Sequence, residues 1–317
     1  MATAVTREVF GQTLLELGRQ DTNIVVVGGD LNASTFATLF AKEFPQRFFD
    51  LGPAEQNMMS MAAGFASTGK TVFATTFAVF GTSRPYDQIR IGIAQAHANV
   101  KIVGSHAGII TGEDGISAQS IEDVALMCAL PGFTVIVPAD GPETAEAVRA
   151  ATREHGPFYI RVSRPATPVV HTPGYKFRLG KAETMRSGGD VSIIACGIMV
   201  AMAMEASENL ARVGIQCRVI NMATIQPLDE EAVRKAATET GALVTAEEHY
   251  IHGGLGSLVS QAASRTAAVP VEMVALERYA ESGHAEQLLA KYGLTAMDVE
   301  QAVRRVLGRK SAGSAKR

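Results

Sequence analysis

Residues 24–29 read Ile-Val-Val-Val-Gly-Gly, a short and uninterrupted apolar run that stops at two glycines. Such a run is typical of a parallel β-strand that is buried on both faces. Runs of this kind recur along the chain, separated by stretches of helical periodicity, and this alternation predicts parallel βαβ units. The further strands are predicted at 71–74, 100–104, 133–137, 158–162, 191–195, 217–220, 242–246 and 271–276.

The alternation is interrupted once, between Arg164 and Gly180. Three prolines lie in this segment and no periodicity is visible, so we predict an interdomain linker. The 317 residues are therefore expected to form an α/β protein of two doubly wound domains with mainly parallel sheets. We place the domains at 1–165 and 181–308, the linker at 166–180 and a disordered tail at 309–317.

Charge and composition exclude several classes of protein. The chain carries 29 Lys and Arg residues against 32 Asp and Glu residues, a formal net charge of −3. This balance gives no electrostatic footprint for nucleic acid, and no apolar run approaches the roughly 18 residues that span a bilayer. No secretory signal is visible at the N-terminus, and the three cysteines lie far apart. We therefore expect a cytoplasmic protein with no nucleic-acid or membrane partner.

The common cofactor and catalytic motifs do not occur in the chain. The first strand ends Gly-Gly-Asp-Leu rather than GxGxxG, and neither a phosphate-binding loop nor a GxSxG elbow is found. His249 and His252 have no third ligand nearby, so we predict no metal site and interpret them as helix-cap or surface residues. Glu247 and Glu248, at a predicted strand end, are interpreted by default as a solvated pair.

Glu55 and two phenylalanines are the first candidate site residues. Glu55 stands at the start of a helix predicted at 56–67, where the helix dipole favours a carboxylate, so taken alone it reads as a capping residue. Phe77 and Phe80 follow the strand at 71–74. Two such rings, taken alone, are more often part of a core than a binding platform.

His106 and Asp114 belong to two further motifs. Ser-His-Ala-Gly at 105–108 follows a predicted strand, and Gly-Glu-Asp-Gly at 112–115 reads as a turn with two acids. Open α/β sheets place ligand sites at the ends of their parallel strands. A plain turn residue is the alternative interpretation of Asp114.

Taken together, the order of these motifs resembles the pyrimidine-binding and C-terminal domains of the transketolase family. The resemblance extends from about Arg7 to about Leu307, and each motif alone is weak. The motifs are AEQNM at 54–58, TFAVF at 76–80, SHAG at 105–108, GEDG at 112–115, VPADG at 137–141, SRP at 163–165, AEEHYIHGGLGS at 246–257 and ESG at 281–283.

The family uses thiamine diphosphate, and the resemblance implies roles for the matching residues. Glu55 matches the glutamate that hydrogen-bonds the aminopyrimidine ring and favours the imino form, which removes the thiazolium proton. Phe77 and Phe80 match the aromatic positions around the pyrimidine, and Phe80 is the better stacking candidate. Asp30 matches an acid near the cofactor.

The resemblance also implies a site for a sugar phosphate. Ser34 matches a hydroxyl that contacts the substrate phosphate. His106, Asp114 and Arg164 match positions that bind sugar hydroxyls and phosphate, and Arg7 lies where the family has another phosphate-binding arginine. The planar guanidinium donates hydrogen bonds in pairs, which suits phosphate.

Two departures from the family pattern concern the sugar. Many members have His or Gln four residues after the aspartate of GEDG, where this chain has Ala118. That donor is therefore either missing or supplied by Gln119. Tyr86 and Arg90 resemble the deoxyxylulose-phosphate synthase branch more than the long-chain transketolases. The donor and acceptor sugars stay open.

The larger departure is a missing segment. Thiamine diphosphate enzymes hold diphosphate and Mg²⁺ through a GDG segment followed by an Asn, and no GDG occurs in this chain. The resemblance therefore implies the smaller, C-terminal subunit of a split transketolase. A separate N-terminal subunit would bring Mg²⁺ and the diphosphate site, and two copies of each chain would form a heterotetramer.

The activity implied by the resemblance is transfer of a two-carbon ketol unit between sugar phosphates. One alternative is the β subunit of a 2-oxoacid dehydrogenase, which also lacks the diphosphate site. A fragment of deoxyxylulose-phosphate synthase is a second alternative, and a catalytically silent scaffold of the same fold is a third. Glu55 favours an active site, because a silent relative is free to lose it.

Overall fold

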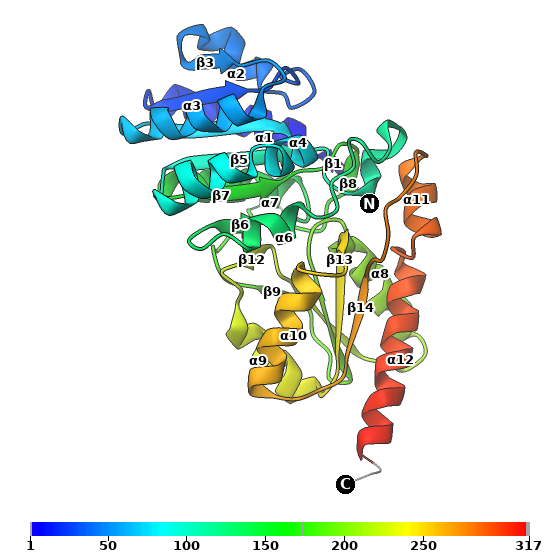
Figure 1. The fold of residues 1–317 in the computed structure, drawn as a ribbon. Helices are drawn as coiled ribbons and strands as arrows, with labels where there is room; N and C mark the ends of the chain where they lie inside the picture. The colour runs from blue at the N-terminus through cyan, green and yellow to red at the C-terminus, as the bar shows by residue number, and fades with distance from the viewer. Residues whose placement is uncertain (1, 173, 315–317) are drawn as a thin grey trace.

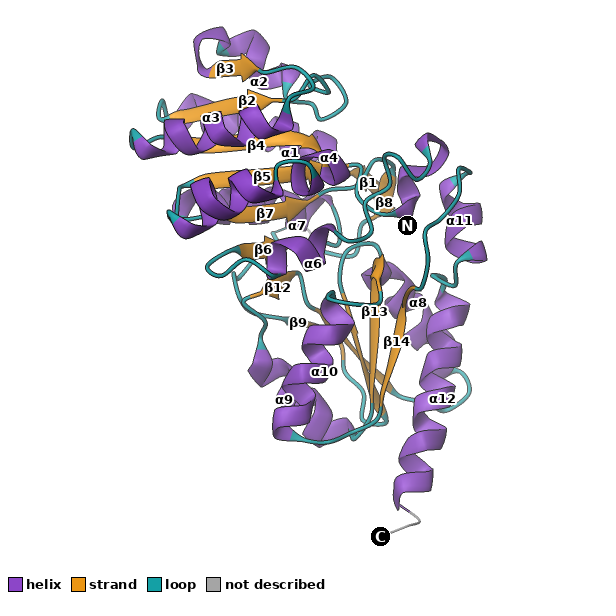
Figure 2. Ribbon diagram, viewed as in Figure 1, coloured by secondary structure: helices purple, strands orange, loops and turns teal. Residues whose placement is uncertain are grey.

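The computed structural model describes residues 2–172 and 174–314 (Figure 1). These residues form two stacked α/β units, each a sheet with its helices, which we call the first and the second layer. The N-terminal half builds the upper, blue-to-green part, and the C-terminal half builds the lower part. Each part has a β-sheet with helices on both faces (Figure 2). The predicted α/β class with mainly parallel sheets is therefore confirmed.

In the described residues the first sheet has seven strands, in the order β12-β6-β7-β5-β4-β2-β3. All strands except β12 run parallel to one another, so their carboxyl ends lie at the same edge. The two central strands are buried along their whole length, which explains why their sequences do not alternate. The parallel strands are β2 (Ile24–Gly28), β3 (Phe48–Asp50), β4 (Thr71–Phe77), β5 (Val100–Ser105), β6 (Thr134–Ile136) and β7 (Phe158–Arg161).

Helices cover both faces of the first sheet. On one face α1 (Thr6–Gln20) packs against α7 (Gly141–Arg153), and α2 (Thr38–Glu43) packs beside α1. The other face is covered by α3 (Glu55–Ser67), the π-helix η2 (Ile89–Gln95) and α6 (Asp123–Cys128). The short elements are η1 (Pro45–Arg47), α4 (Ala78–Ser83), α5 (Tyr86–Gln88) and η3 (Ile109–Asp114).

The second sheet has the order β14-β13-β10-β11-β9, and only β9 (Glu183–Arg186) is antiparallel to its neighbour. Its parallel strands are β10 (Val191–Ala195), β11 (Cys217–Asn221), β13 (Leu243–Tyr250) and β14 (Val271–Leu276). One face carries α8 (Met199–Ala211) and α12 (Ala296–Ser314), and the other carries α9 (Glu230–Thr240) and α10 (Leu255–Thr266). The short helix α11 (Ala285–Lys291) packs against η3 of the first layer. No helix among the described residues combines the length and hydrophobicity that crossing a bilayer requires.

The two layers share a core. β12 (Thr224–Gln226) belongs to the second half of the chain, yet it pairs antiparallel with β6 at the edge of the first sheet. One cluster of buried apolar side chains also runs without a break from Met58 and Val135 into Val233 and Leu255. This continuity fixes the second sheet against the first, with the carboxyl end of β13 directed towards it (Figure 1).

Two segments differ from the expectations that the sequence raised. The predicted linker begins with strand β8 (Ala166–Pro168), which pairs antiparallel with β1 (Thr3–Val5). A strand of three residues has no readable periodicity, so its partner decides its structure. The helical pattern of residues 85–98 predicts one continuous helix, whereas the structure has α5 followed by the π-helix η2.

The prediction of a disordered tail from residue 309 is wrong, because α12 continues to Ser314. Arg309 donates to the carbonyl of Val271 at 2.9 Å and to Glu272 at 2.6 Å. Lys310 donates to the carbonyls of Asp190 and Thr240 at 3.0 and 2.7 Å. These contacts fasten the last turns of the helix to the second sheet, which a small and polar composition does not reveal. Residues 315–317 lie outside the described part.

A buried carboxylate ties the first layer to the segment between the layers. Asp140, the N-cap residue of α7, accepts hydrogen bonds from the amides of Glu143, Val170 and His171 at 2.8–3.0 Å. The same carboxylate lies 3.0 Å from Nδ1 of His171. The Glu143 side chain in turn accepts from Asn221 in the second layer at 2.8 Å.

Asp140→Ala should therefore lower the free energy of unfolding by about 3–5 kcal/mol, because it leaves several buried donors without an acceptor. Urea unfolding of the chain measures this loss. Asp229→Ala is the matched control, because Asp229 is also an N-cap residue and, within the described part of the chain, accepts from two amides, those of Ala182 and Ala232. That variant should lose about 1–2 kcal/mol. Equal losses in the two variants would contradict the special role of Asp140.

Candidate active site

The candidate site residues come from neighbouring strand ends of the first sheet. Asp30 follows β2, Phe77 ends β4, His106 follows β5, and Arg164 lies three residues after the end of β7. Because these strands are parallel, their polar and aromatic end residues gather at one edge, where open α/β sheets bind ligands.

Glu55 is the first residue of α3, and only 4% of it is exposed. Its carboxylate forms an ion pair with Arg84, whose NH1 lies 2.8 Å from Oε1. Within the described residues, Oε2 accepts no hydrogen bond. The N-cap residue of α3 is Ala54 and makes no side-chain cap hydrogen bond, so Glu55 is not a capping residue, although the helix dipole favours a carboxylate at this position. Arg84 is not among the residues predicted from the sequence, although Ser83-Arg84-Pro85 directly precedes α5.

The aromatic residues form a row that starts next to Glu55. The guanidinium carbon of Arg84 lies 4.1 Å from the centre of the Phe80 ring. Phe80 stacks on Phe77 with 5.9 Å between ring centres and 14° between planes. Phe77 in turn stacks on the His106 imidazole at 3.7 Å. The predicted residues Glu55, Phe77, Phe80 and His106 are therefore brought together, with Arg84 between the carboxylate and the rings.

His106 is held in an unusual backbone conformation, with a φ of +56°. Its Nδ1 lies 2.9 Å from Oγ of Ser105, and its carbonyl accepts from the Thr111 hydroxyl at 2.6 Å. Burial, together with the charges of Arg7 and Arg164, lowers the pKa of His106 to about 3. The imidazole is therefore neutral at physiological pH, and the two arginines set the local potential.

Arg7 and Arg164 lie beside each other. Arg7 donates from Nε to the carbonyl of Arg164 at 2.9 Å and from NH1 to the carbonyl of Ser34 at 2.6 Å. Burial and the charge of Arg164 lower the pKa of Arg7. Arg164 donates from NH1 to the carbonyl of Thr111 at 2.6 Å. Its Nε and NH2 have no hydrogen-bond partner among the described residues.

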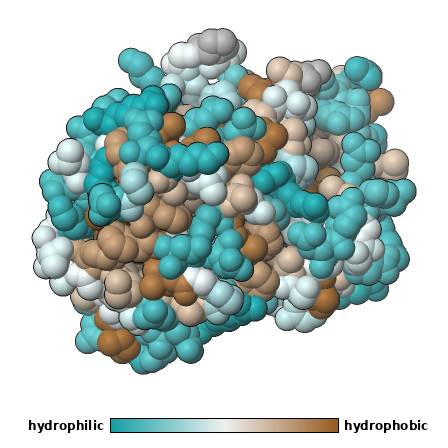
Figure 3. Space-filling model, turned by 90° about the horizontal axis from the view of Figure 1, so that it is seen from above, coloured by the Kyte–Doolittle hydropathy of each residue, from teal (hydrophilic) through white to brown (hydrophobic). Residues whose placement is uncertain are grey.

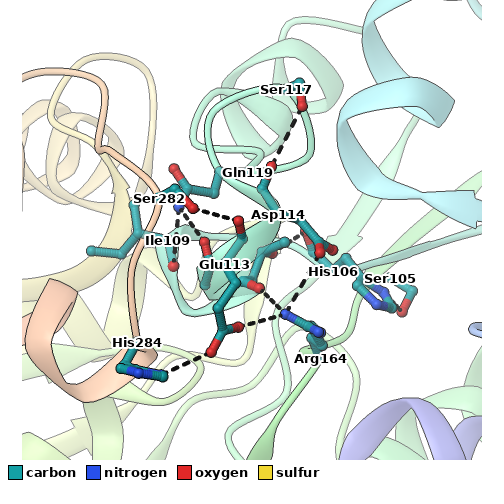
Figure 4. A network of polar contacts seen from close by, with 12 residues as sticks. Ser105, His106, Ile109, Glu113, Asp114, Ser117, Gln119, Arg164, Ser282 and His284 are labelled. Atoms are coloured by element: carbon teal, nitrogen blue, oxygen red, sulfur yellow. Dashed lines mark hydrogen bonds and ion pairs between the residues drawn. The ribbon is translucent and has the colours of Figure 1, made fainter.

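The Gly-Glu-Asp-Gly segment links Arg164 to the second layer (Figure 4). Glu113 lies between Arg164 and His284, at 3.0 and 2.9 Å, and its carbonyl accepts from the Ser282 hydroxyl. Asp114 is 3.8 Å from NH1 of Arg164. Asp114 is thus next to the cationic group, and Glu113 makes the closer contact.

Asp30 and Ser34 lie in the loop after β2 and are less closely connected to the other residues. Asp30 has a φ of +68°, and its amide donates to Asp50 at 3.0 Å. Within the described part of the chain, the Asp30 carboxylate makes no hydrogen bond or ion pair. Only the backbone carbonyl of Ser34 reaches the site, through Arg7.

Gln119 does not replace the donor that is missing at Ala118. Its side chain is 4% exposed, and Nε2 donates to the carbonyls of Gly112 and Glu281 at 3.3 and 3.1 Å. The Nε2 donor therefore holds the loop and is not available to a sugar, whereas Oε1 is buried without a hydrogen-bond partner among the described residues. Of the two alternatives that the sequence left open, the structure favours a missing donor.

Glu247 and Glu248 are not a solvated pair, since they are only 2% and 3% exposed. Glu247 accepts from the amides of Leu255 and Gly256 at the start of α10, both at 2.7 Å. Glu248 contacts the loop that carries His106. His249 is also buried, with Nε2 accepting from the Ala125 amide at 3.3 Å. Two adjacent acidic residues at a predicted strand end do not indicate from sequence that both are buried.

A pyrimidine ring fits the residues at this edge. Oγ of Thr76 is buried next to Phe77 and has no hydrogen-bond partner among the described residues. Phe80 offers an aromatic ring beside the Glu55 carboxylate, with the guanidinium carbon of Arg84 4.1 Å from the ring centre. Among the described residues, no group of three or more His, Cys, Asp or Glu side chains is arranged to hold a metal ion.

Comparisons with known proteins show the family of the chain. Residues 2–169 match the model of the transketolase pyrimidine-binding domain, and residues 180–299 match that of the transketolase C-terminal domain. The chain belongs to the transketolase family. Membership of this family implies the use of thiamine diphosphate.

The similar proteins include subunits of split enzymes. A putative transketolase C-terminal section from Methanocaldococcus jannaschii is 42% identical and covers 95% of both chains. A 6-deoxy-6-sulfo-D-fructose transketolase subunit from a Clostridium species is 40% identical over 96% of this chain and 95% of its own. A solved split-gene transketolase, described as an inactive β4 tetramer, has a TM-score of 0.90 at 44% identity, covering 98% of this chain and all of the other.

The chain spans about half the length of the one-chain relatives that it matches. Human transketolase, 38% identical over 94% of this chain, is covered over 48% of its own length. The chain therefore corresponds to one part of such an enzyme.

The pKa of His106 allows a direct test of the site's charge. In the unfolded chain a histidine has a pKa of about 6.5, so the folded state binds fewer protons from about pH 6.5 down to about pH 3. Stability from this neutral imidazole is thus present above that range and is lost as the pH falls through it. We expect nitrogen-15 NMR of the chain to show a neutral His106 ring at pH 5.5. An imidazolium signal there would contradict the arrangement described.

Proposed function

We propose that this chain is the smaller subunit of a thiamine diphosphate-dependent transketolase that transfers a two-carbon ketol unit between sugar phosphates. The observation that carries the proposal is the row from Glu55 through the stacked rings to His106. The row combines a carboxylate, Arg84 and stacked aromatic rings, and Arg7 and Arg164 lie close to its His106 end.

The carboxylate and the rings act on the cofactor. When bound, thiamine diphosphate supplies the electron sink for breaking the ketose carbon–carbon bond. Phe80 and Phe77 would hold the pyrimidine ring by stacking. Glu55 would hold or share a proton at its carboxylate next to that ring, and Arg84 keeps the carboxylate in place. We propose that Asp30 lies near the bound cofactor.

The arginines act on the substrate. The lowered pKa values of Arg7 and His106 both result in part from neighbouring positive charge, which a bound phosphate neutralises. Nε and NH2 of Arg164 have no hydrogen-bond partner among the described residues, which suits a pair of phosphate oxygens. Neutral His106 and Asp114 orient the sugar hydroxyls, and Ser34 lies on the phosphate side.

A second subunit completes the site in this proposal. The chain has no GDG segment, so Mg²⁺ and the diphosphate are held by an N-terminal partner. Met61 of α3 and Ile91 of η2 are large apolar side chains exposed on adjacent helices. Hydrophobic residues also gather on one side of the face seen in Figure 3, bordered by hydrophilic ones. Such a surface suits a partner, and we propose a heterotetramer of two copies of each chain.

The names of similar proteins and the side chains of the site together indicate which donor and acceptor sugars to test. Two similar proteins are a 6-deoxy-6-sulfo-D-fructose transketolase subunit and an apulose-4-phosphate transketolase subunit. The Ala118 side chain cannot donate a hydrogen bond, and Nε2 of Gln119 is bonded to loop carbonyls. The sugar is therefore held by fewer side-chain donors next to Asp114 than in family members that have His or Gln at the position of Ala118. Branched and sulfonated ketoses therefore belong in the substrate panel.

The proposal is tested with the chain reconstituted with a companion subunit that carries GDG and Asn. Ketol transfer from a panel of ketose phosphates to an aldose phosphate is measured for the wild type and for Glu55→Gln. We expect Glu55→Gln to lower kcat by roughly 10²–10⁴-fold, because the amide does not share a proton in the same way. The melting temperature should stay close to that of the wild type.

Glu43→Gln is the matched control, because Glu43 is an exposed glutamate that pairs with Arg19 far from the site. It should retain full activity. Full activity of Glu55→Gln would remove the cofactor assignment. Turnover of a 2-oxoacid, with none of any ketose phosphate, would replace the proposed reaction.

A further inference from the structure

The loop from His106 to Asp114 rests on a side chain of the second layer. Glu248 lies in β13, and its Oε1 accepts a hydrogen bond from the amide of Ile110 at 2.8 Å. Beside it, Gly108 has no side chain, and a Cβ added there would overlap the Glu248 carboxylate. The carboxylate therefore occupies the space that a side chain at position 108 would need.

Glu248 is held in place from the other side by Arg161. NH1 of Arg161 lies 3.7 Å from Oε2 of Glu248, and NH2 donates to the Glu248 carbonyl at 2.9 Å. Arg161 also binds Asp123 through Nε at 2.9 Å. All three residues are buried. Burial raises the pKa of Glu248 to about 7, against the opposing charge of Arg161, so a proton on this carboxyl costs little.

The loop needs such support because its backbone is unusual. His106 has a φ of +56°, and Gly108 and Gly112 both have a φ of +79°. A non-glycine residue in this region costs of order 1 kcal/mol or more and persists only when its surroundings fix it. The second layer fixes the far end of the loop as well, through Ser282 and His284 on Glu113 (Figure 4).

We propose that Glu248 is a positioning residue for the sugar phosphate site. It touches neither substrate nor cofactor; by holding Ile110 it fixes the loop in which His106 and Asp114 face the ligand. The C-terminal domain thereby takes part in substrate binding at a distance. This inference rests on the proposed function, because a sugar phosphate must bind at that loop.

The chain offers a matched control in the neighbouring residue. Glu247 is as buried as Glu248 and lies in the same strand. Its carboxylate binds the amides of Leu255 and Gly256 at the start of α10. No hydrogen bond or ion pair joins it to the loop within the described residues. Shortening Glu247 therefore perturbs the same strand and domain without releasing the loop.

The experiment compares Glu248→Asp, Glu248→Gln and Glu247→Asp in the complete complex. Glu248→Asp keeps the charge for Arg161 but loses the reach to Ile110, whereas Glu248→Gln keeps both the reach and an acceptor oxygen. KM for the ketose phosphate should rise roughly tenfold in Glu248→Asp, the cost of one buried hydrogen bond, with a smaller change in kcat. Glu248→Gln should stay within about threefold of the wild type, and Glu247→Asp should lower the melting temperature but leave KM unchanged.

Hydrogen exchange of the chain alone supplies a readout that needs no activity. The segment around Ile110 should exchange faster in Glu248→Asp and at the wild-type rate in Glu247→Asp. An unchanged KM together with unchanged exchange in Glu248→Asp would overturn the inference, as would an equal rise of KM in Glu247→Asp. If the wild-type complex turns over no ketose phosphate, the proposed function fails, while exchange still decides whether Glu248 holds the loop.

Discussion

The contact between Arg161 and two buried carboxylates is the interaction on which the rest of the site depends. Arg161 ends β7 of the first sheet, Asp123 begins α6, and Glu248 comes from β13 of the second sheet. Breaking such a buried cluster costs about 3–5 kcal/mol, because it leaves a charge without its partner. The cluster therefore holds the two sheets in one orientation, and the loop with His106 and Asp114 lies directly on that junction.

This orientation divides the work of the site between the two layers. The first layer supplies the chemical groups: the Glu55 carboxylate, the stacked rings and the two arginines. The second layer supplies support, through Glu248 below the loop and through Ser282 and His284 at its far end. The sequence contains no GDG segment, and in the proposed function a partner subunit holds diphosphate and Mg²⁺. In the proposed function the chain is one half of an active site, with a pre-formed sugar phosphate side and an open cofactor side.

The sequence predicted what depends on local pattern and order. Buried parallel strands have continuous apolar sequences. The strands, the α/β class and the clustering of strand-end residues could therefore all be predicted from the sequence. The contacts between distant segments were not. Glu248 and Ile110 are 138 positions apart, so the burial of that carboxylate depends on packing rather than on its neighbours in sequence. The pairing of Arg84 with Glu55 and the role of Gln119 could not be predicted for the same reason. The same holds for the helical end of the chain, where Arg309 and Lys310 bond to residues of distant segments.

The shared active site is the central claim, and the affinity for thiamine diphosphate tests it most directly. Titration calorimetry in the presence of Mg²⁺ compares this chain alone, the diphosphate-binding subunit alone and an equimolar mixture. The account predicts that the mixture binds at least about 100-fold more tightly than this chain alone, because only the mixture holds both ends of the cofactor. Equally tight binding by this chain alone would contradict it.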